Sequence, residues 1–216
     1  MAVIPLVRQH TIVETEAAYN QVGGDNGNAA WIQNLDPSQL NAAGSNVSYD
    51  LRVGAEYKDH REPGKKDLPT GSDIQLLPGA AVIIETEESV RLPRSMFGYI
   101  VPKVSLLKKG LSNTMSKVDP GYNGHLLVTL FNLGKQIETI QRKQPFCALT
   151  LLQVLEGANL YGGSAKKIEG NAKRSIWHKT RDLLEVYHVF VELGLIIVTF
   201  ALTIATVFLT IAHFMS

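Results

Sequence analysis

The C-terminal part of the chain contains an apolar run without a charged residue, LGLIIVTFALTIATVFLTIA, at residues 193–212. A helix rises about 1.5 Å per residue, so this run would measure about 30 Å, the thickness of the hydrocarbon core of a bilayer. A buried helix of a soluble protein is the alternative, but this run is apolar around its whole circumference. We therefore expect a helical segment over residues 181–216 with a transmembrane span at about 193–215, and a separate folded domain before it.

Basic residues precede this run. Residues 165–181 contain six lysines and arginines, against Glu169 as the single acidic residue. Positive charges beside a span remain on the cytoplasmic side, and they also favour anionic headgroups. We therefore expect a single-pass, tail-anchored membrane protein whose N-terminal domain faces the cytoplasm.

The rest of the chain is long enough for one domain with its own core. The formal net charge of +1 argues against nucleic-acid binding through bulk electrostatics. Cys147, the single cysteine, stands among apolar residues and is predicted to be a buried thiol rather than a reactive one. The six histidines are scattered and no CxxC or HxxxH spacing occurs, so we expect no zinc and no metal site built from side chains.

From about Trp31 onward, short apolar runs alternate with turn residues. The runs are rich in β-branched and aromatic residues and are bounded by Gly, Pro, Asn and Asp, as in GHLLVTLFN at residues 124–132. This pattern is typical of a mainly β sandwich or barrel. We expect a β domain over residues 35–160, with a short helical turn at 104–111, and a basic arm and juxtamembrane segment over 161–180. Residues 1–34 remain unassigned.

Five segments, taken in order, resemble the dCTP deaminase and dUTPase superfamily, and its dCTP deaminase branch more closely. They are SNVSYDLRVGAEY (45–57), the stretch from LLPGAAVIIETEESVRLP to VPKVSLLKKGL (76–111), VDPGYNGHLLVTLFN (118–132), QPFCALTLLQV (144–154) and YGGSAKKIEGN (161–171). The resemblance implies a distorted jelly-roll, dUTPase-like barrel that assembles as a homotrimer with active sites between subunits. It also implies a deoxynucleotide ligand whose triphosphate is bound with Mg²⁺.

The resemblance implies roles for individual residues. Asp50 and Arg52 would belong to the first motif, and residues 103–111 would contact phosphate. Residues 119–124 would form the hairpin that holds sugar and base, with the Tyr122 ring against the deoxyribose. The implied nucleotide-binding residues are Lys103, Ser105, Lys108, Asp119, Tyr122, Tyr161, Lys167 and Asn171.

The residue types agree with part of this assignment. A Pro-Gly turn can present backbone N–H groups to a flat base, and an aromatic ring beside it can stack on a sugar. The alternative for Asp119 is a carboxylate that only caps the turn. The alternative for the lysines is a solvated basic face.

The chain departs from the deaminase pattern at the general base. That branch uses a glutamate on the strand after the hairpin to deprotonate water, and counting from DPGYNG places Thr129 at its position. The position of the supporting arginine holds Lys108, and that of the first of two serines holds Val104. A threonine hydroxyl cannot replace a carboxylate as a base, so we expect Thr129 to be inactive in deamination.

The dUTPase pattern is matched in part. Asp119 stands where dUTPases carry the aspartate that orients the attacking water, so it is the candidate catalytic residue for hydrolysis. The Pro-Arg-Ser motif of dUTPases, however, is replaced by Pro102-Lys103-Val104, and their glutamine is replaced by Ala148.

Three hypotheses follow. The first is a membrane-anchored enzyme that deaminates dCTP or hydrolyses dUTP. The second is a catalytically degenerate nucleotide sensor that signals to the membrane, in stress or phage defence. The third is a scaffold that binds no nucleotide. One face of the expected span adds a prediction of helix contacts within a trimer, because it carries Thr199, Thr203, Thr206 and Thr210.

Overall fold

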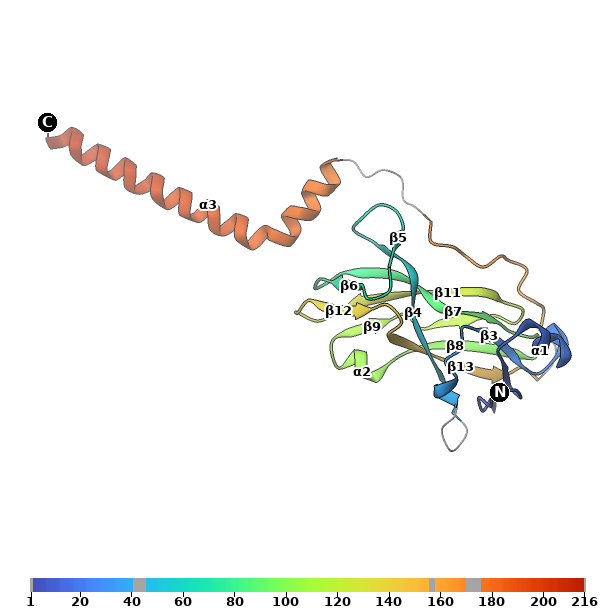
Figure 1. Cartoon of the computed structure of the whole chain (residues 1–216). Coiled ribbons are helices and arrows are strands. Elements are labelled where there is room, and N and C mark those ends of the chain that lie inside the picture. Colours follow the sequence, from blue (N-terminus) through green and yellow to red (C-terminus); the bar gives the residue numbers. More distant parts are fainter. Residues whose placement is uncertain (1, 41–45, 156–157, 170–175, 216) are drawn as a thin grey trace. The chain divides into compact units, whose positions relative to one another are not determined.

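The computed structural model describes residues 2–40, 46–155, 158–169 and 176–215. The chain divides into two compact units, Met1–Gly170, called the head below, and Asn171–Ser216. Figure 1 shows the head as layers of strands. The strands are β1 (Ala2–Val3), β2 (Ile12–Val13), β3 (Ala30–Gln33), β4 (Tyr49–Asp59), β5 (Lys66–Asp67), β6 (Asp73–Leu76), β7 (Ala81–Arg91), β8 (Met96–Pro102), β9 (Leu111–Asn113), β10 (Ser116–Val118), β11 (Asn123–Asn132), β12 (Glu138–Gln141) and β13 (Pro145–Gln153). The helices are α1 (Glu16–Gln21), η1 (Gly24–Asn26), η2 (Pro37–Leu40), α2 (Val104–Leu107) and α3 (Ile176–Met215).

Eleven of the described strands form one sheet, whose main path runs β10-β8-β13-β4-β7-β11-β9. The strands β6 and β12 pair separately, and β1, β2, β3 and β5 join the large sheet beside its main path. The strands that carry the hairpin, β10 and β11, therefore lie in different parts of the sheet, β10 against β8 and β11 between β7 and β9.

The strands β7 and β11 show why these residues form a half-buried sheet. In β7 every second residue from Val82 to Val90 is buried, and in β11 Leu126, Val128 and Leu130 are buried. Because successive side chains of a strand point to opposite faces, this alternation turns one face to the core and leaves the other half-buried. The mainly β fold class predicted from the sequence is confirmed.

The N-terminal residues, which the sequence left unassigned, belong to the head. The strand β1 pairs with β13, β2 runs parallel to β3, and β3 pairs with β7. Ile4, Leu6 and Ile12 are buried in the same core as the later strands. The compact unit therefore extends on both sides of the expected 35–160 domain, from the N-terminal residues to Gly170.

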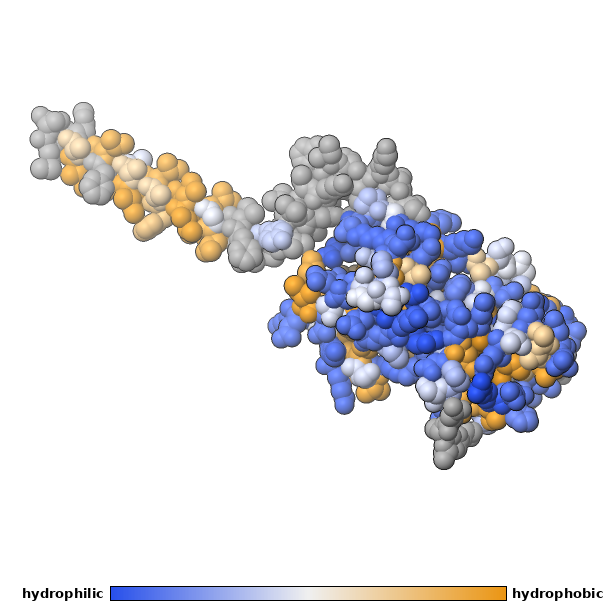
Figure 2. All heavy atoms as spheres, in the orientation of Figure 1, coloured by the Kyte–Doolittle hydropathy of each residue, from blue (hydrophilic) through white to orange (hydrophobic). Residues whose placement is uncertain are grey.

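The helix α3 lies in the second unit. Of the helices in the described part of the chain, it alone contains a segment long and apolar enough to cross a membrane, Glu192–Ala212. Figure 2 shows this segment as a largely hydrophobic surface. The four threonine hydroxyls of the span donate to carbonyls of the preceding turn, for example Thr203 Oγ1 to Thr199 O at 2.8 Å and Thr210 Oγ1 to Thr206 O at 2.7 Å. Their hydrogen-bonding capacity is thus met within the helix, and a contact between helices stays a prediction.

The prediction for Cys147 is confirmed. Its side chain lies in β13 with no exposed surface, and it belongs to the main core. Burial raises the pKa of the thiol well above its ordinary value. A protonated, buried thiol is a poor nucleophile, so Cys147 is a packing residue.

Candidate functional site

The hairpin between β10 and β11 is fixed to the body of the head by backbone hydrogen bonds. Gly121 N donates to Leu92 O at 2.9 Å, and Leu92 N donates to Tyr122 O at 3.0 Å. Tyr122 N donates to Asp119 O at 3.1 Å and closes the turn. Gly121 has φ +79°, in the left-handed region that favours glycine. The N–H groups of Gly121 and Tyr122 are therefore engaged within the head, so the expectation that the turn presents these two groups to a base is wrong.

Residues 158–169, called the arm below, lie against this hairpin. Tyr161 N donates to Pro120 O at 2.7 Å, and the rings of Tyr161 and Tyr122 lie 5.8 Å apart between centroids. A Cβ on Gly121 would stand 2.8 Å from Leu160 Cδ2, and one on Gly124 would stand 2.3 Å from Ala165 Cβ. The two glycines are thus the positions where the arm approaches the hairpin too closely for a side chain.

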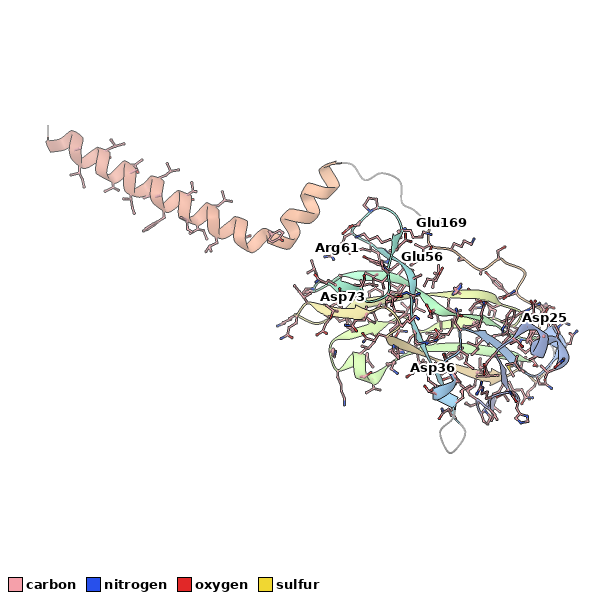
Figure 3. All side chains as sticks on the ribbon, in the orientation of Figure 1. Asp25, Asp36, Glu56, Arg61, Asp73 and Glu169 are labelled. Carbon is pink, nitrogen blue, oxygen red and sulfur yellow. The ribbon has the colours of Figure 1, made fainter. Side chains whose placement is uncertain are left out.

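The end of the arm is fastened to another strand. Lys58 Nζ, on β4, donates to Glu169 O at 3.0 Å. Figure 3 shows Glu169 at this end of the arm, on the side of the head that carries Glu56 of β4. The arm is therefore held at both ends, at the hairpin by Tyr161 and at β4 by Lys58.

A pocket of about 330 Å³ lies between the hairpin and the arm. Lys117 Nζ lies 2.9 Å from Asp119 Oδ1 in this pocket, and the Asp119 side chain keeps 32% of its surface exposed. The pocket therefore combines two aromatic rings, two lysines and a carboxylate that solvent can reach. Its lining residues are Ile100, Ser116, Lys117, Asp119, Tyr122, Leu126, Leu127, Tyr161 and Lys166.

The structure brings three of the predicted site residues together and places the others elsewhere. Asp119, Tyr122 and Tyr161 line the pocket. Thr129 lies on the half-buried face of β11, two residues beyond Leu127, and pairs with Ile83 of β7. Lys167 is exposed on the arm, and Asn171 lies outside the described residues.

The predicted phosphate-contacting residues lie on another part of the head. Lys103 occupies the N-cap position of α2, and its side chain forms an ion pair with Asp50 of β4. Ser105 and Lys108 are exposed on α2 and at its C-terminal end. None of these three residues lines the hairpin pocket.

Arg52 links two strands of the sheet. Its Nε donates to Glu88 Oε1 at 2.7 Å and its backbone N to Glu88 Oε2 at 2.9 Å. Tyr49 OH donates to the same carboxylate at 3.0 Å. Burial raises the pKa of Glu88, and the hydrogen bonds and charge of Arg52 oppose that rise. The half-buried Arg52 and the fully buried Glu88 thus form an ion pair between β4 and β7.

Sequence reasoning missed the two cationic residues of the pocket, Lys117 and Lys166. A signal for Lys117 was present, because it precedes Asp119 by two residues and side chains two apart in a strand share a face. No pattern indicated Lys166 in preference to Lys167. Which of two adjacent lysines enters the pocket depends on how the arm lies on the hairpin.

Comparisons with known proteins identify the family of the chain. Residues 24–154 match the family model described as dCTP deaminase-like. The dCTP deaminase of Buchnera aphidicola is 32% identical over 110 residues, which are 48% of this chain and 57% of that protein. The deoxyuridine 5'-triphosphate nucleotidohydrolase of Escherichia phage T5 is 34% identical over 79 residues, 36% of this chain and 53% of that protein.

Among solved structures, a 2'-deoxycytidine 5'-triphosphate deaminase from Agrobacterium tumefaciens is similar with a TM-score of 0.47 and 20% identity, over 64% of this chain and 47% of that chain. The chain spans about half the length of the two curated relatives above, 57% and 53%.

Proposed function

The chain belongs to the dCTP deaminase-like family, and we propose that its head binds a pyrimidine deoxynucleoside triphosphate and processes it hydrolytically, at the pyrimidine ring or at the phosphate chain. The observation that carries this proposal is the pocket that gathers Asp119, Tyr122 and Tyr161 from the hairpin and the arm. The ligand class comes from the relatives, which are named for dCTP and for deoxyuridine triphosphate.

The lining residues suit the parts of such a ligand. The rings of Tyr122 and Tyr161 offer aromatic faces for a sugar or a base. Lys117 and Lys166 offer positive charge for phosphate oxygens. Asp119 offers a carboxylate that can accept a hydrogen bond from a sugar hydroxyl or orient a water. These are the functions that a nucleotide site needs.

Mg²⁺ would reach the site with the triphosphate, because Mg²⁺ is usually bound through substrate phosphates, waters and one or two carboxylates. Asp119 supplies an oxygen ligand of the required kind at the pocket, so the residues present fit the ion. Bound there, the ion would neutralise phosphate charge. Lys117 already compensates the charge of Asp119 at 2.9 Å and would be free to turn to a phosphate.

We also propose that α3 anchors the head in a membrane, with the head in the cytoplasm, and that three chains assemble. The apolar segment Glu192–Ala212 and the basic residues before it support the anchor. The separation of α2 from the hairpin pocket supports the assembly. If Lys103, Ser105 and Lys108 contact phosphate, they would do so in the pocket of a neighbouring chain.

A nucleotide sensor is the second candidate. The observation that favours it is the course of the chain, because the arm that closes on the hairpin leads within a few residues into α3. A ligand that changed the contact between Tyr161 and Pro120 would act on the segment next to the membrane helix. Thr129 in place of the expected glutamate also favours binding without turnover.

The test uses the full chain in detergent with Mg²⁺. The heat of binding is measured for dCTP, dUTP, CTP and dATP, and products are separated after incubation. We expect binding of a pyrimidine deoxynucleotide in preference to CTP and dATP, and a loss of binding in Tyr122→Ala. The matched control is Tyr99→Ala, because Tyr99 lies on β8 outside the pocket lining. Binding without product would favour the sensor, and no binding of any nucleotide would contradict both candidates.

A further inference from the structure

Glu85 lies next to the pocket, on a strand that the family resemblance does not associate with chemistry. It belongs to the half-buried face of β7 and is paired in register with Leu127 of β11, which lines the pocket. Side chains directly opposite each other in an antiparallel pair lie about 4.5–5.5 Å apart at Cβ, and diagonal neighbours about 7–8 Å apart. Glu85 is thus the direct neighbour of Leu127 and the diagonal neighbour of Thr129, whose partner is Ile83.

The backbone beside Glu85 is irregular in both ladders of β7. The pairing with β11 shifts between His125 and Leu127, and the pairing with β4 shifts between Val53 and Tyr57. Such bulges re-aim side chains and are frequent beside active sites. On the β4 side the fit depends on Gly54, since a Cβ there would stand 2.2 Å from Glu85 O.

Hydrogen bonds from Thr86 hold the irregular stretch in place. Leu126 N donates to Thr86 Oγ1 at 2.9 Å, and Thr86 Oγ1 donates to Glu88 O at 2.7 Å. His125 Nδ1 lies 2.9 Å from Thr86 O. A carbonyl oxygen only accepts, so Nδ1 carries a proton and the lone pair of a neutral ring is on Nε2. The side chains of Glu85 and His125 therefore project from a braced segment.

The carboxylate of Glu85 has no hydrogen bond or ion pair with any residue of the described part of the chain. The pKa of Glu85 is raised, chiefly by burial and in a smaller part by the charge of Glu56. The positive charges of His125, Lys65 and Lys167 oppose this rise. The pKa of Tyr122 is raised to about 12, first by burial, then by Tyr161, and then by the charge of Glu85. Glu85 therefore acts electrostatically on the hairpin tyrosine and on an arm lysine.

The charge of Glu85 decides which end of a nucleotide it can face. Like charges repel, and more strongly in a partly buried site than in water, so a carboxylate beside an uncompensated phosphate is unfavourable. The lysines of the pocket lining, Lys117 and Lys166, suit the phosphates. Glu85 thus suits the uncharged pyrimidine, and chemistry at Glu85 is chemistry on the ring.

We propose that Glu85, braced beside His125, is the acid–base residue of this site and acts on the amino-substituted carbon of a cytosine ring. The carboxylate takes over on β7 the role that Thr129 cannot fill on β11. This inference rests on the proposed function and selects deamination of dCTP from the two hydrolytic reactions.

The step conserves atoms and needs no oxidant or reductant. The oxygen of a water forms a bond to C4 of the ring, and Glu85 accepts one of its protons. Glu85 delivers that proton to N3 of the ring. It then takes the second proton of the former water from the C4 hydroxyl and passes it to the amino nitrogen, which leaves as ammonia when the C4–N bond breaks. A C4 carbonyl remains, so cytosine and water give uracil and ammonia. A carboxyl group whose pKa is raised by burial suits such acceptance and return.

The test compares the full chain in detergent with its Glu85→Gln variant, using dCTP and Mg²⁺ and detecting ammonia and dUTP. General acid–base catalysis contributes about 10²–10⁴-fold, so we expect kcat to fall by at least about 100-fold while the Kd for dCTP changes by less than about threefold. The Glu85→Asp variant should recover part of the rate. In the wild type, kcat/KM should rise with pH as Glu85 ionises, with a pKa set by burial and by the charges of His125, Glu56, Lys65 and Lys167. The residual activity of Glu85→Gln should lack this rise with pH.

The matched control is Glu138→Gln, a half-buried glutamate of β12 that is remote in the pairing scheme from β7 and β11. It should leave kcat unchanged. Full activity of Glu85→Gln, or formation of dUMP and pyrophosphate by the wild type instead of ammonia, would overturn the proposal. Wild-type binding of dCTP without turnover would also overturn it while leaving the nucleotide site intact. Absence of binding would instead remove the proposed function itself.

Discussion

The contact between the hairpin and the arm gives the sharpest prediction about the candidate site, and the variant Gly121→Ala tests it. Gly121 has φ +79°, and a Cβ there would stand 2.8 Å and 2.9 Å from two side-chain atoms of Leu160 and 3.0 Å from Tyr161 N. An alanine would therefore be strained by its backbone and would push the arm away from the turn.

The magnitude follows from two contributions. A non-glycine residue in the left-handed region costs about 1–2 kcal/mol. Displacement of the arm breaks the hydrogen bond from Tyr161 N to Pro120 O, 2.7 Å long, and a typical intramolecular hydrogen bond contributes about 1 kcal/mol net. We expect Gly121→Ala to lower the free energy of unfolding of the head by about 2–3 kcal/mol in total.

Gly71→Ala is the matched control. Gly71 has φ +86° but no atom within 4 Å of the position of a Cβ. This variant should show only the backbone contribution of about 1–2 kcal/mol. Urea unfolding measures both free energies, and hydrogen exchange measures the protection of the Tyr161 amide. Only Gly121→Ala should lose that protection and bind nucleotide more weakly. If Tyr161 stays protected in Gly121→Ala, or loses protection equally in Gly71→Ala, the arm does not depend on this contact.

Three further predictions concern buried and half-buried groups of the head. Arg52→Leu should lower the free energy of unfolding by about 3–5 kcal/mol, because it leaves the fully buried Glu88 carboxylate without its ion pair. Denaturant unfolding at several pH values should show that the variant loses more of this free energy at high pH, where Glu88 is ionised. Glu85→Gln should be more stable than wild type at pH 7.5. The pKa of Glu85 is raised in the folded state, so the wild-type protein loses stability as the pH rises through that pKa, and the neutral glutamine does not. In thermal unfolding at pH near 4, about the pKa of an unfolded glutamate, the curves of the variant and the wild type should come together. Cys147 should react with a thiol reagent only on unfolding, because burial raises its pKa and no surface is exposed; rapid modification in the native state would contradict this.

The sequence predicted those parts of the fold whose side-chain pattern is local. The alternation in β7 and β11, the Pro-Gly turn at 120–121, the helical turn of α2 and the apolar segment of α3 are all properties of neighbouring residues. Residues 1–34 gave no such signal because their strands β1 and β2 are two residues long each. They join the sheet only through partners far along the chain, β13 for β1.

The candidate site was predictable only where its residues come from one segment. Asp119 and Tyr122 share the hairpin and were found together, whereas Lys166 enters the pocket through the placement of the arm. From the sequence alone, the alternating pattern of the strand predicts that Glu85 is an ordinary polar residue on the solvent-facing side. Its significance depends on the register between β7 and β11 and on the shift at His125, and neither can be obtained from the sequence pattern. Lys103 was assigned to phosphate, and its pairing with Asp50 likewise depends on the tertiary fold.

The central claim is that a pyrimidine deoxynucleotide binds between the hairpin and the arm. Hydrogen exchange of the full chain in detergent, measured by peptide with Mg²⁺ and with or without dCTP, locates the site directly. We expect dCTP to slow exchange in peptides covering residues 116–127 and 158–169, and CTP at the same concentration to do so less. Unchanged exchange in both segments, with protection elsewhere or nowhere, would contradict the account.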